Sequence, residues 1–175
     1  MRIKIDQEKV KQFEKKIKLI LKVRRILTGK KFEPPVDISK GLPEMMQALA
    51  MRPDIAKAMM PFSQAVYMNG QVERALKEKI FVKVSKLNQC QFCTATHTKA
   101  LESLNLKEEG KDERERVALE YTEQVTKDAN KVADELFARL KQHFNDGEII
   151  ELTLSIGMIN LLNKFNDALQ IKFRE

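Results

Sequence analysis

The sequence predicts an all-α protein, a compact bundle of about seven or eight helices. Apolar residues recur at spacings of three and four along most of the chain, which is the periodicity of amphipathic helices. Glycine and proline are scarce, at six and five residues, and tryptophan is absent, whereas a β-sandwich would need many turns. A chain of 175 residues suits one domain that buries enough surface to fold without disulfides.

The first predicted helix follows Asp6, because aspartate is well suited to cap a helix N-terminus. Apolar residues then repeat with helical spacing until Gly29 ends the pattern, and the lysines and arginines between them form a basic outer face. The Pro34–Pro35 pair forbids helix and stiffens the chain. We therefore expect an N-terminal amphipathic helix and connector over residues 1–40, and the helical core over residues 41–175.

The core should begin with two helices that start at prolines, because proline is favoured in the first helical turn. Pro43 begins a short helix, and Pro53 begins a longer one that Asn69–Gly70 closes. Pro61 should kink this second helix or reset its start. Residues 71–87 include a β-branched run that could form a strand, but the apolar stripe around it has helical spacing, which favours a helix.

Four further helices complete the predicted bundle. Short polar or glycine-containing breaks separate them, and no internal repeat is evident. The expected ranges are 90–104, 114–127, 131–144 and 148–170.

The charge pattern argues against several classes of partner. The net charge is +7, from 32 basic and 25 acidic residues, but the charges are interleaved as on solvated helix faces, and no nucleic-acid-binding motif is recognisable. The N-terminus lacks the apolar run of a signal peptide, and the longest uncharged stretches are too short to cross a membrane. We expect a cytoplasmic protein with no nucleic-acid or membrane partner.

Both cysteines of the chain lie in one short stretch, NQCQFCTATH. Cys90 and Cys93 are three residues apart, and His97 follows four residues after the second. If Asn88 or its neighbour caps a helix here, the two sulfurs and the imidazole share one helical face. The helix N-terminus favours thiolate over thiol, and His97 can carry a proton. In a cytoplasmic protein such a pair is more often catalytic or metal-binding than structural.

Several chemistries compete for these residues. Covalent haem attachment needs a histidine directly after the second cysteine, where this chain has Thr94. Zinc needs four ligands, whereas Cys90, Cys93 and His97 supply three, and there is no second C-x-x-C motif. His143 could be a fourth ligand, but it lies at an expected helix end, where a histidine near the last carbonyls needs no metal. Two buried, inert cysteines are a further alternative. A thiol–disulfide redox site is favoured, although not of the thioredoxin type, which expects a βαβ context.

Together with an upstream glutamate, these residues resemble a family motif. Glu78 precedes Cys90 by twelve residues, and Cys93 and His97 follow at plus three and plus seven, as in the alkylhydroperoxidase D-like family of the carboxymuconolactone decarboxylase superfamily. The resemblance covers most of residues 42–170. It implies an all-α fold and an obligate homo-oligomer, a trimer or hexamer.

The resemblance also implies an antioxidant thiol peroxidase that reduces small hydroperoxides. It implies no cofactor beyond the redox-active cysteine pair, and an external dithiol or lipoyl-type electron donor. Cys93 would attack the peroxide, Cys90 would resolve the sulfenic acid to a disulfide, and Glu78 with His97 would relay protons. Spacing alone leaves the roles of the cysteines open, because His97 favours Cys93 and the helix dipole favours Cys90.

Phe92 departs from the family pattern, because the best-known peroxidases of the family carry a histidine just before the second cysteine. Phenylalanine cannot relay protons, so a slower thiol–disulfide oxidoreductase is one alternative function. The other is a non-catalytic helical oligomer with a structural or metal-binding cysteine pair.

Four polar side chains allow a purely structural interpretation. Glu78 has Arg74 at i−4 and could form an ordinary surface ion pair. Asn160, Asn163 and Asp167 lie on one face of the last predicted helix, where they could form a buried polar network or an interface.

Overall fold

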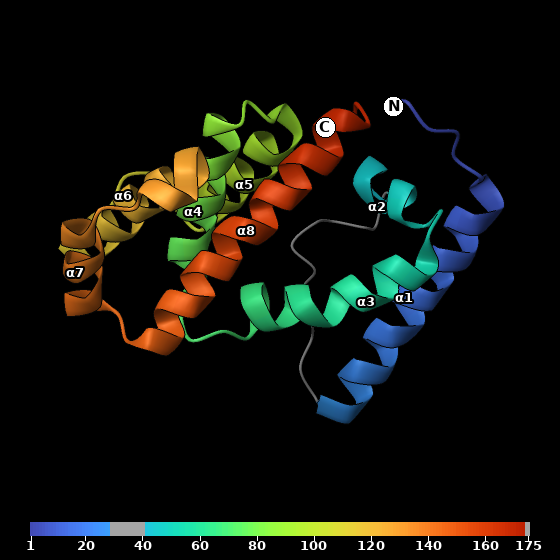
Figure 1. The fold of residues 1–175 in the computed structure, drawn as a ribbon. Helices are drawn as coiled ribbons and strands as arrows, with labels where there is room; N and C mark the ends of the chain where they lie inside the picture. Colours follow the sequence, from blue (N-terminus) through green and yellow to red (C-terminus); the bar gives the residue numbers. More distant parts are fainter. Residues whose placement is uncertain (29–40, 174–175) are drawn as a thin grey trace.

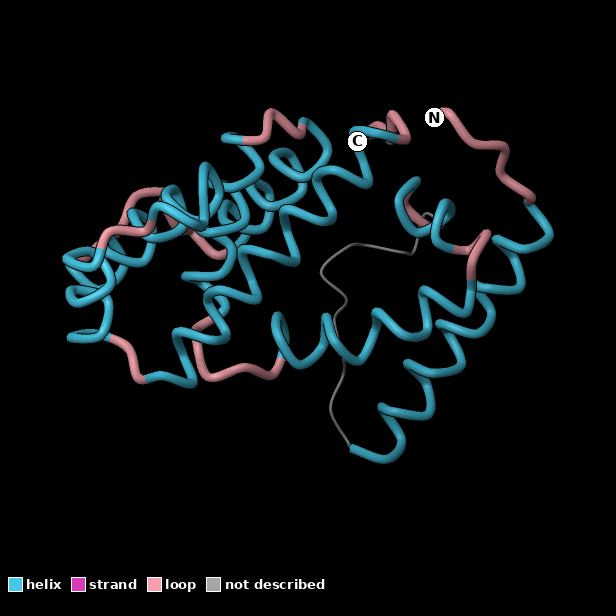
Figure 2. Tube along the Cα trace, in the orientation of Figure 1, coloured by secondary structure: helices cyan, strands magenta, loops and turns pink. Residues whose placement is uncertain are grey.

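A computed structural model of the protein describes residues 1–28 and 41–173, and within these ranges every regular element is helical (Figures 1 and 2). The all-α prediction is confirmed. The predicted helix end at Gly29 and the connector with Pro34–Pro35 lie outside the described residues. The α-helices are α1 Gln7–Thr28, α2 Glu44–Leu49, α3 Pro53–Ser63, α4 Arg74–Leu87, α5 Gln91–Ser103, α6 Glu113–Asp128, α7 Asp134–His143 and α8 Asp146–Ala168.

Helix α1 begins as predicted, because the Asp6 carboxylate accepts hydrogen bonds from the backbone N–H groups of Glu8 at 2.9 Å and Lys9 at 3.2 Å. Helix α1 lies beside α3 (Figure 1). Its apolar stripe belongs to a small cluster separate from the main core. The buried members of this cluster are Val10, Phe13, Ile17, Leu42, Ala50 and Ala56. Within the described ranges, no helix is long and apolar enough to span a bilayer.

Helix α3 contains Pro61 in its interior and does not restart there. Three residues later the chain widens into a π-helical turn, η1 Gln64–Met68, which ends at Asn69. Such turns add a residue to the helical repeat and are frequent at functional sites. Here the turn places the ring of Tyr67 in the main core, against Phe81 of α4.

Helix α4 lies at the centre of the bundle and packs against α5, α6 and α8 (Figure 1). The predicted stripe of Leu76, Ile80 and Val84 is buried, which confirms helix over strand for this segment. The burial extends beyond one stripe, because two lysines and Glu78 are also inaccessible to solvent.

The two buried lysines of α4 connect it to its neighbours through carboxylates. Lys77 pairs with Glu151 of α8, and Lys79 pairs with Glu115 of α6 at 2.7 Å. Glu151 also accepts a hydrogen bond from the Gln71 backbone N–H at 2.6 Å. A buried charge is tolerated only when it is paired, so these contacts fix how α4 sits on α8 and α6.

Glu151→Ala should therefore destabilise the protein strongly, because it leaves the Lys77 ammonium buried and unpaired. We expect the free energy of unfolding, measured by urea denaturation at fixed protein concentration, to fall by about 3 kcal/mol. Glu120→Ala, which removes a carboxylate from an exposed pair with Arg139, should change it little. The double variant Lys77→Met/Glu151→Leu should recover most of the loss. An equal effect of the two single variants would contradict this account.

Candidate active site

The cysteine pair lies at the junction of α4 and α5, where the chain makes a tight left-handed turn. Gln89 has φ 59°, the Cys90 N–H donates to the Ser85 carbonyl at 2.9 Å, and the Gln89 N–H donates to the Lys86 carbonyl at 3.0 Å. These bonds form a Schellman motif at the end of α4. Asn88 is the C-cap of α4 and Cys90 itself is the N-cap of α5, so the expectation that Asn88 or its neighbour caps the second helix is wrong.

The Asn88 side chain instead joins a polar network between α4 and α8. It donates to the side-chain oxygens of Asn160 at 2.7 Å and Asn163 at 2.9 Å. The Asn163 amide in turn donates to the Ser85 hydroxyl at 3.1 Å. Asn160 and Asn163 thus belong to an internal polar network, whereas Asp167 is exposed and interacts with the Cys90 thiol.

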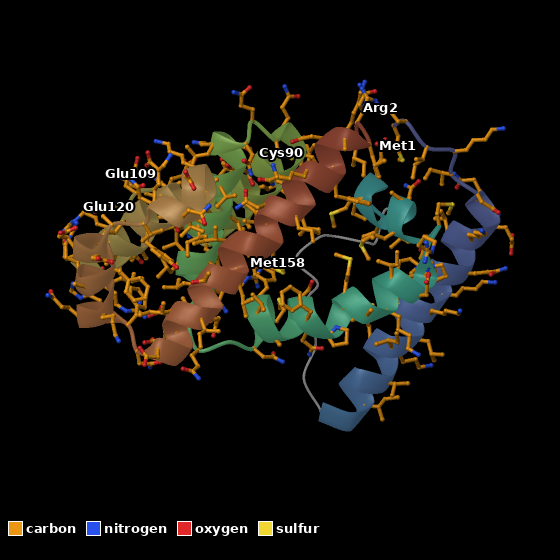
Figure 3. All side chains as sticks on the ribbon, in the orientation of Figure 1. Met1, Arg2, Cys90, Glu109, Glu120 and Met158 are labelled. Atoms are coloured by element: carbon orange, nitrogen blue, oxygen red, sulfur yellow. The ribbon has the colours of Figure 1, made fainter. Side chains whose placement is uncertain are left out.

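Both thiols are free and buried, with Cys90 0% and Cys93 3% exposed. Cys90 lies where α5 begins, beside the C-terminal half of α8 (Figure 3). The hydrogen bond from the Cys90 thiol lowers the pKa of Cys93 to about 7 despite burial, and the Asn166 and Asn163 amides and His97 act in the same direction. The same hydrogen bond, with burial, raises the pKa of Cys90. Cys93 is therefore the thiol that ionises more readily near neutral pH, and Cys90 stays protonated and donates to it.

Glu78 reaches the cysteine region from the middle of α4. Its carboxylate, 0% exposed, lies 2.8 Å through Oε2 from His97 Nδ1. Burial opposes its ionisation, but hydrogen bonds from His97 and Tyr67 and the nearby Arg74 charge hold the pKa of Glu78 below its usual value. A carboxylate bound to Nδ1 fixes that nitrogen as the donor in the neutral imidazole and leaves Nε2 free to take a proton.

The other carboxylate oxygen of Glu78 is also occupied. Tyr67 donates its hydroxyl to Oε1, and Arg74 Nε lies 3.4 Å from the same atom. The predicted Arg74 pair therefore exists together with the His97 contact. Burial raises the pKa of Tyr67, so its hydroxyl stays protonated and remains a donor. Phe81 packs edge-to-face on His97, with ring centroids 4.9 Å apart, and holds the imidazole in place.

Two residues of the site were not predicted from the sequence. Tyr67 comes from the π-helical turn, and no motif marks it. Asn166 Nδ2 lies 3.1 Å from Cys93 Sγ. The polar face predicted on the last helix included its neighbours Asn163 and Asp167 but not Asn166, although all three approach the cysteines.

Phe92 and His143 lie in ordinary structural positions. Phe92 is buried, and its ring packs on Phe173 with centroids 6.2 Å apart. His143 is the last residue of α7. In the described part of the chain, no three His, Cys, Asp or Glu side chains are grouped as a metal ion would require.

The hydrogen bond between the thiols can be tested with a matched pair of variants. In Cys90→Ser a hydroxyl can still donate to Cys93, so the midpoint of the pH dependence of Cys93 alkylation should stay near 7. In Cys90→Ala the donor is lost, and the midpoint should rise toward the ordinary thiol value of about 8.5. The measurement is the rate of iodoacetamide labelling against pH, read by mass spectrometry. Identical midpoints in the two variants would exclude the hydrogen bond from Cys90 as the main cause of the lowered Cys93 pKa.

Comparison with known proteins places these residues in a family context. Residues 53–135, which contain the glutamate, both cysteines and the histidine, match the model of the Carboxymuconolactone decarboxylase family. The uncharacterized protein YdfG of Bacillus subtilis (strain 168) is 29% identical over 111 residues, covering 56% of this chain and 76% of that protein.

Solved structures share the fold. A protein of unknown function from Agrobacterium tumefaciens, assigned provisionally to antioxidant defence as AhpD, has a TM-score of 0.66 and 28% identity, covering 73% of this chain and 96% of that chain. An uncharacterized peroxidase-related protein from Ralstonia eutropha with an alkylhydroperoxidase AhpD core has a TM-score of 0.70 and 19% identity, covering 99% and 92%. The debrominase Bmp8 has a TM-score of 0.69 and 18% identity, covering 77% and 79%.

Proposed function

Because this chain belongs to the carboxymuconolactone decarboxylase superfamily and has the alkylhydroperoxidase D-like fold, we propose that it is a thiol peroxidase. Cys93 and Cys90 would reduce hydroperoxides through a dithiol–disulfide cycle. The observation that carries the proposal is the unequal acidity of two thiols in hydrogen-bond contact, because a peroxidase needs one nucleophilic thiolate and one protonated partner.

In the first step the Cys93 thiol passes its proton to His97 Nε2, and Glu78 stabilises the imidazolium through Nδ1. The thiolate attacks the terminal oxygen of the hydroperoxide, so a sulfur–oxygen bond forms and the O–O bond breaks. Sulfur is oxidised by two electrons to the sulfenic acid, and the peroxide is reduced. His97 returns the proton to the departing alkoxide, which leaves as the alcohol.

In the second step the Cys90 sulfur attacks the Cys93 sulfur of the sulfenic acid. The sulfur–oxygen bond breaks, and the hydroxide leaves as water with the proton of Cys90. Asp167, which interacts with the Cys90 thiol, lies where it can assist this proton transfer. An external dithiol, of the lipoyl type or on a small thiol protein, then reduces the disulfide by exchange and restores both thiols.

Sulfenate trapping tests the assignment of the two cysteines. After one equivalent of cumene hydroperoxide and a dimedone trap, Cys90→Ser should accumulate adduct on Cys93, because no thiol remains to resolve the sulfenic acid. Cys93→Ser should give no adduct and no turnover. Adduct on Cys90 in Cys93→Ser, with none on Cys93 in the reciprocal variant, would reverse the roles. If the thiols of the wild-type protein react with neither peroxides nor disulfides, the non-catalytic alternative is favoured.

The relay should be visible in the same assay. His97→Ala removes the proton carrier, so we expect the rate of the first oxidation to fall by about 10²–10⁴-fold. Glu78→Gln should act in the same direction, because a neutral amide stabilises the imidazolium less. Thr98→Ala, one residue further along α5, serves as the control and should leave the rate unchanged. A His97→Ala rate equal to wild type would remove His97 from the mechanism.

A thiol–disulfide oxidoreductase is the second candidate function, because the same Cys93 thiolate could attack a disulfide in place of a peroxide. Phe92 favours it, since this position cannot supply a second relay histidine. The comparison that decides is the rate of single-turnover oxidation by cumene hydroperoxide against that by oxidised glutathione. Faster reaction with the disulfide would make the reductase the main function.

We also propose that the protein is a homo-oligomer, a trimer or hexamer. Ile150, Leu154 and Leu161 are exposed along one face of α8, and apolar rows of this kind mark protein interfaces. Light scattering should give three or six times the 20.3 kDa chain mass. Leu154→Glu should lower that mass, whereas Glu120→Lys on α6 should not. A monomer at micromolar concentration in the wild type would contradict the proposal.

A further inference from the structure

Asn166, in the last turn of α8, has one half of its amide bonded and the other half free. The side chain is 0% exposed, and its Nδ2 donates to Cys93 Sγ at 3.1 Å. Its Oδ1 has no hydrogen-bond partner among the described residues. The unpaired oxygen therefore lies beside the sulfur that carries the proposed chemistry, because both amide atoms are bonded to one carbon.

An unpaired buried amide oxygen is costly, and a functional role is one reason for it to persist. Within the described ranges only one other buried side-chain oxygen or nitrogen is unpaired, that of Ser155, about three turns earlier in α8. Asn166 is also held firmly, because the Ile171 N–H donates to its backbone carbonyl at 2.9 Å in the turn that ends the helix. This bond fixes the backbone of Asn166, and the contact of its Nδ2 with Cys93 Sγ orients the side chain.

We propose that Asn166 is a catalytic residue that binds the terminal O–H group of the hydroperoxide through Oδ1. The inference rests on the proposed peroxidase function and names the feature of the substrate that the site recognises. With Nδ2 on the Cys93 sulfur and Oδ1 on the O–H group, one rigid amide holds the nucleophile and the oxygen it attacks next to each other.

The assignment is consistent with the balance of the first step. The terminal oxygen keeps its hydrogen when it moves from the peroxide to sulfur, so Asn166 never has to remove a proton, which an amide cannot do. The same O–H···Oδ1 bond can persist in the sulfenic acid. His97 serves the other peroxide oxygen, which leaves and takes up the proton. The site would therefore select hydroperoxides, which carry an O–H group, over dialkyl peroxides and disulfides, which do not.

The test compares two buried asparagines of α8. Asn163 also lowers the pKa of Cys93, but its Oδ1 is already occupied by Asn88. Wild type, Asn166→Leu and Asn163→Leu are each reacted in single turnover with cumene hydroperoxide and with 4,4′-dithiodipyridine, a disulfide without an O–H group. The pH is set well above the midpoint of Cys93 alkylation in every variant, so that loss of thiolate does not contribute.

We expect Asn166→Leu to lose about 10–100-fold more rate with the hydroperoxide than with the disulfide, which corresponds to one buried hydrogen bond. Asn163→Leu should lose the same factor in rate with the hydroperoxide and with the disulfide. Asn166→Ala, which leaves room for water, should show the same selectivity in weaker form, and it replaces Asn166→Leu if that variant does not fold. Equal losses with both reagents in the Asn166 variants would overturn the inference. A wild type that reacts only with the disulfide would instead refute the peroxidase function and the inference with it.

Discussion

The arrangement of the candidate site depends on one buried carboxylate. Glu78 lies in the middle of the central helix, where an unpaired charge would be prohibitively costly. Its two oxygens therefore need partners, and Tyr67, Arg74 and His97 supply them. Local structure positions two of these partners. The π-helical turn before α4 places Tyr67, and the packing of Phe81 holds the His97 imidazole. The need to pair the Glu78 carboxylate therefore determines where the His97 imidazole lies relative to the thiols.

Much of the fold could be predicted from the sequence, because helical periodicity and capping residues act locally. The cap at Asp6, the proline-led helices and the choice of helix for α4 are all confirmed. The full burial of α4 could not be predicted, since its lysines are polar in the sequence and become core residues only through carboxylates on α6 and α8. Partners that lie 36 or 74 residues away leave no periodic signal.

The candidate site was also predicted only in part, because local patterns are visible in the sequence and contacts between distant residues are not. Cys90, Cys93 and His97 form a local pattern, and their place at the start of one helix follows from their spacing. The helix dipole suggested that Cys90 could be the more acidic thiol, but direct hydrogen bonds to Cys93 outweigh it. Asn88 was predicted in the wrong role and Asn166 was missed, because their contacts depend on how α8 crosses α4 and α5, which only the assembled bundle defines.

The left-handed turn between α4 and α5 has a consequence for how this chain can vary. Gln89 is the only residue between the C-cap of α4 and the N-cap of α5, so the connection cannot take up a residue without moving one of the helices. If the first turn of α5 had to absorb one residue more or less, the face that α5 presents to α4 would turn by about 100°, which would carry Cys93 away from Asn166 and His97 away from Glu78. The loop between α5 and α6 is longer, because residues 105–111 separate the C-cap Leu104 from the N-cap Asp112. Related sequences should therefore tolerate a change of length more readily in that loop, while the interval from Glu78 to Cys90 stays constant.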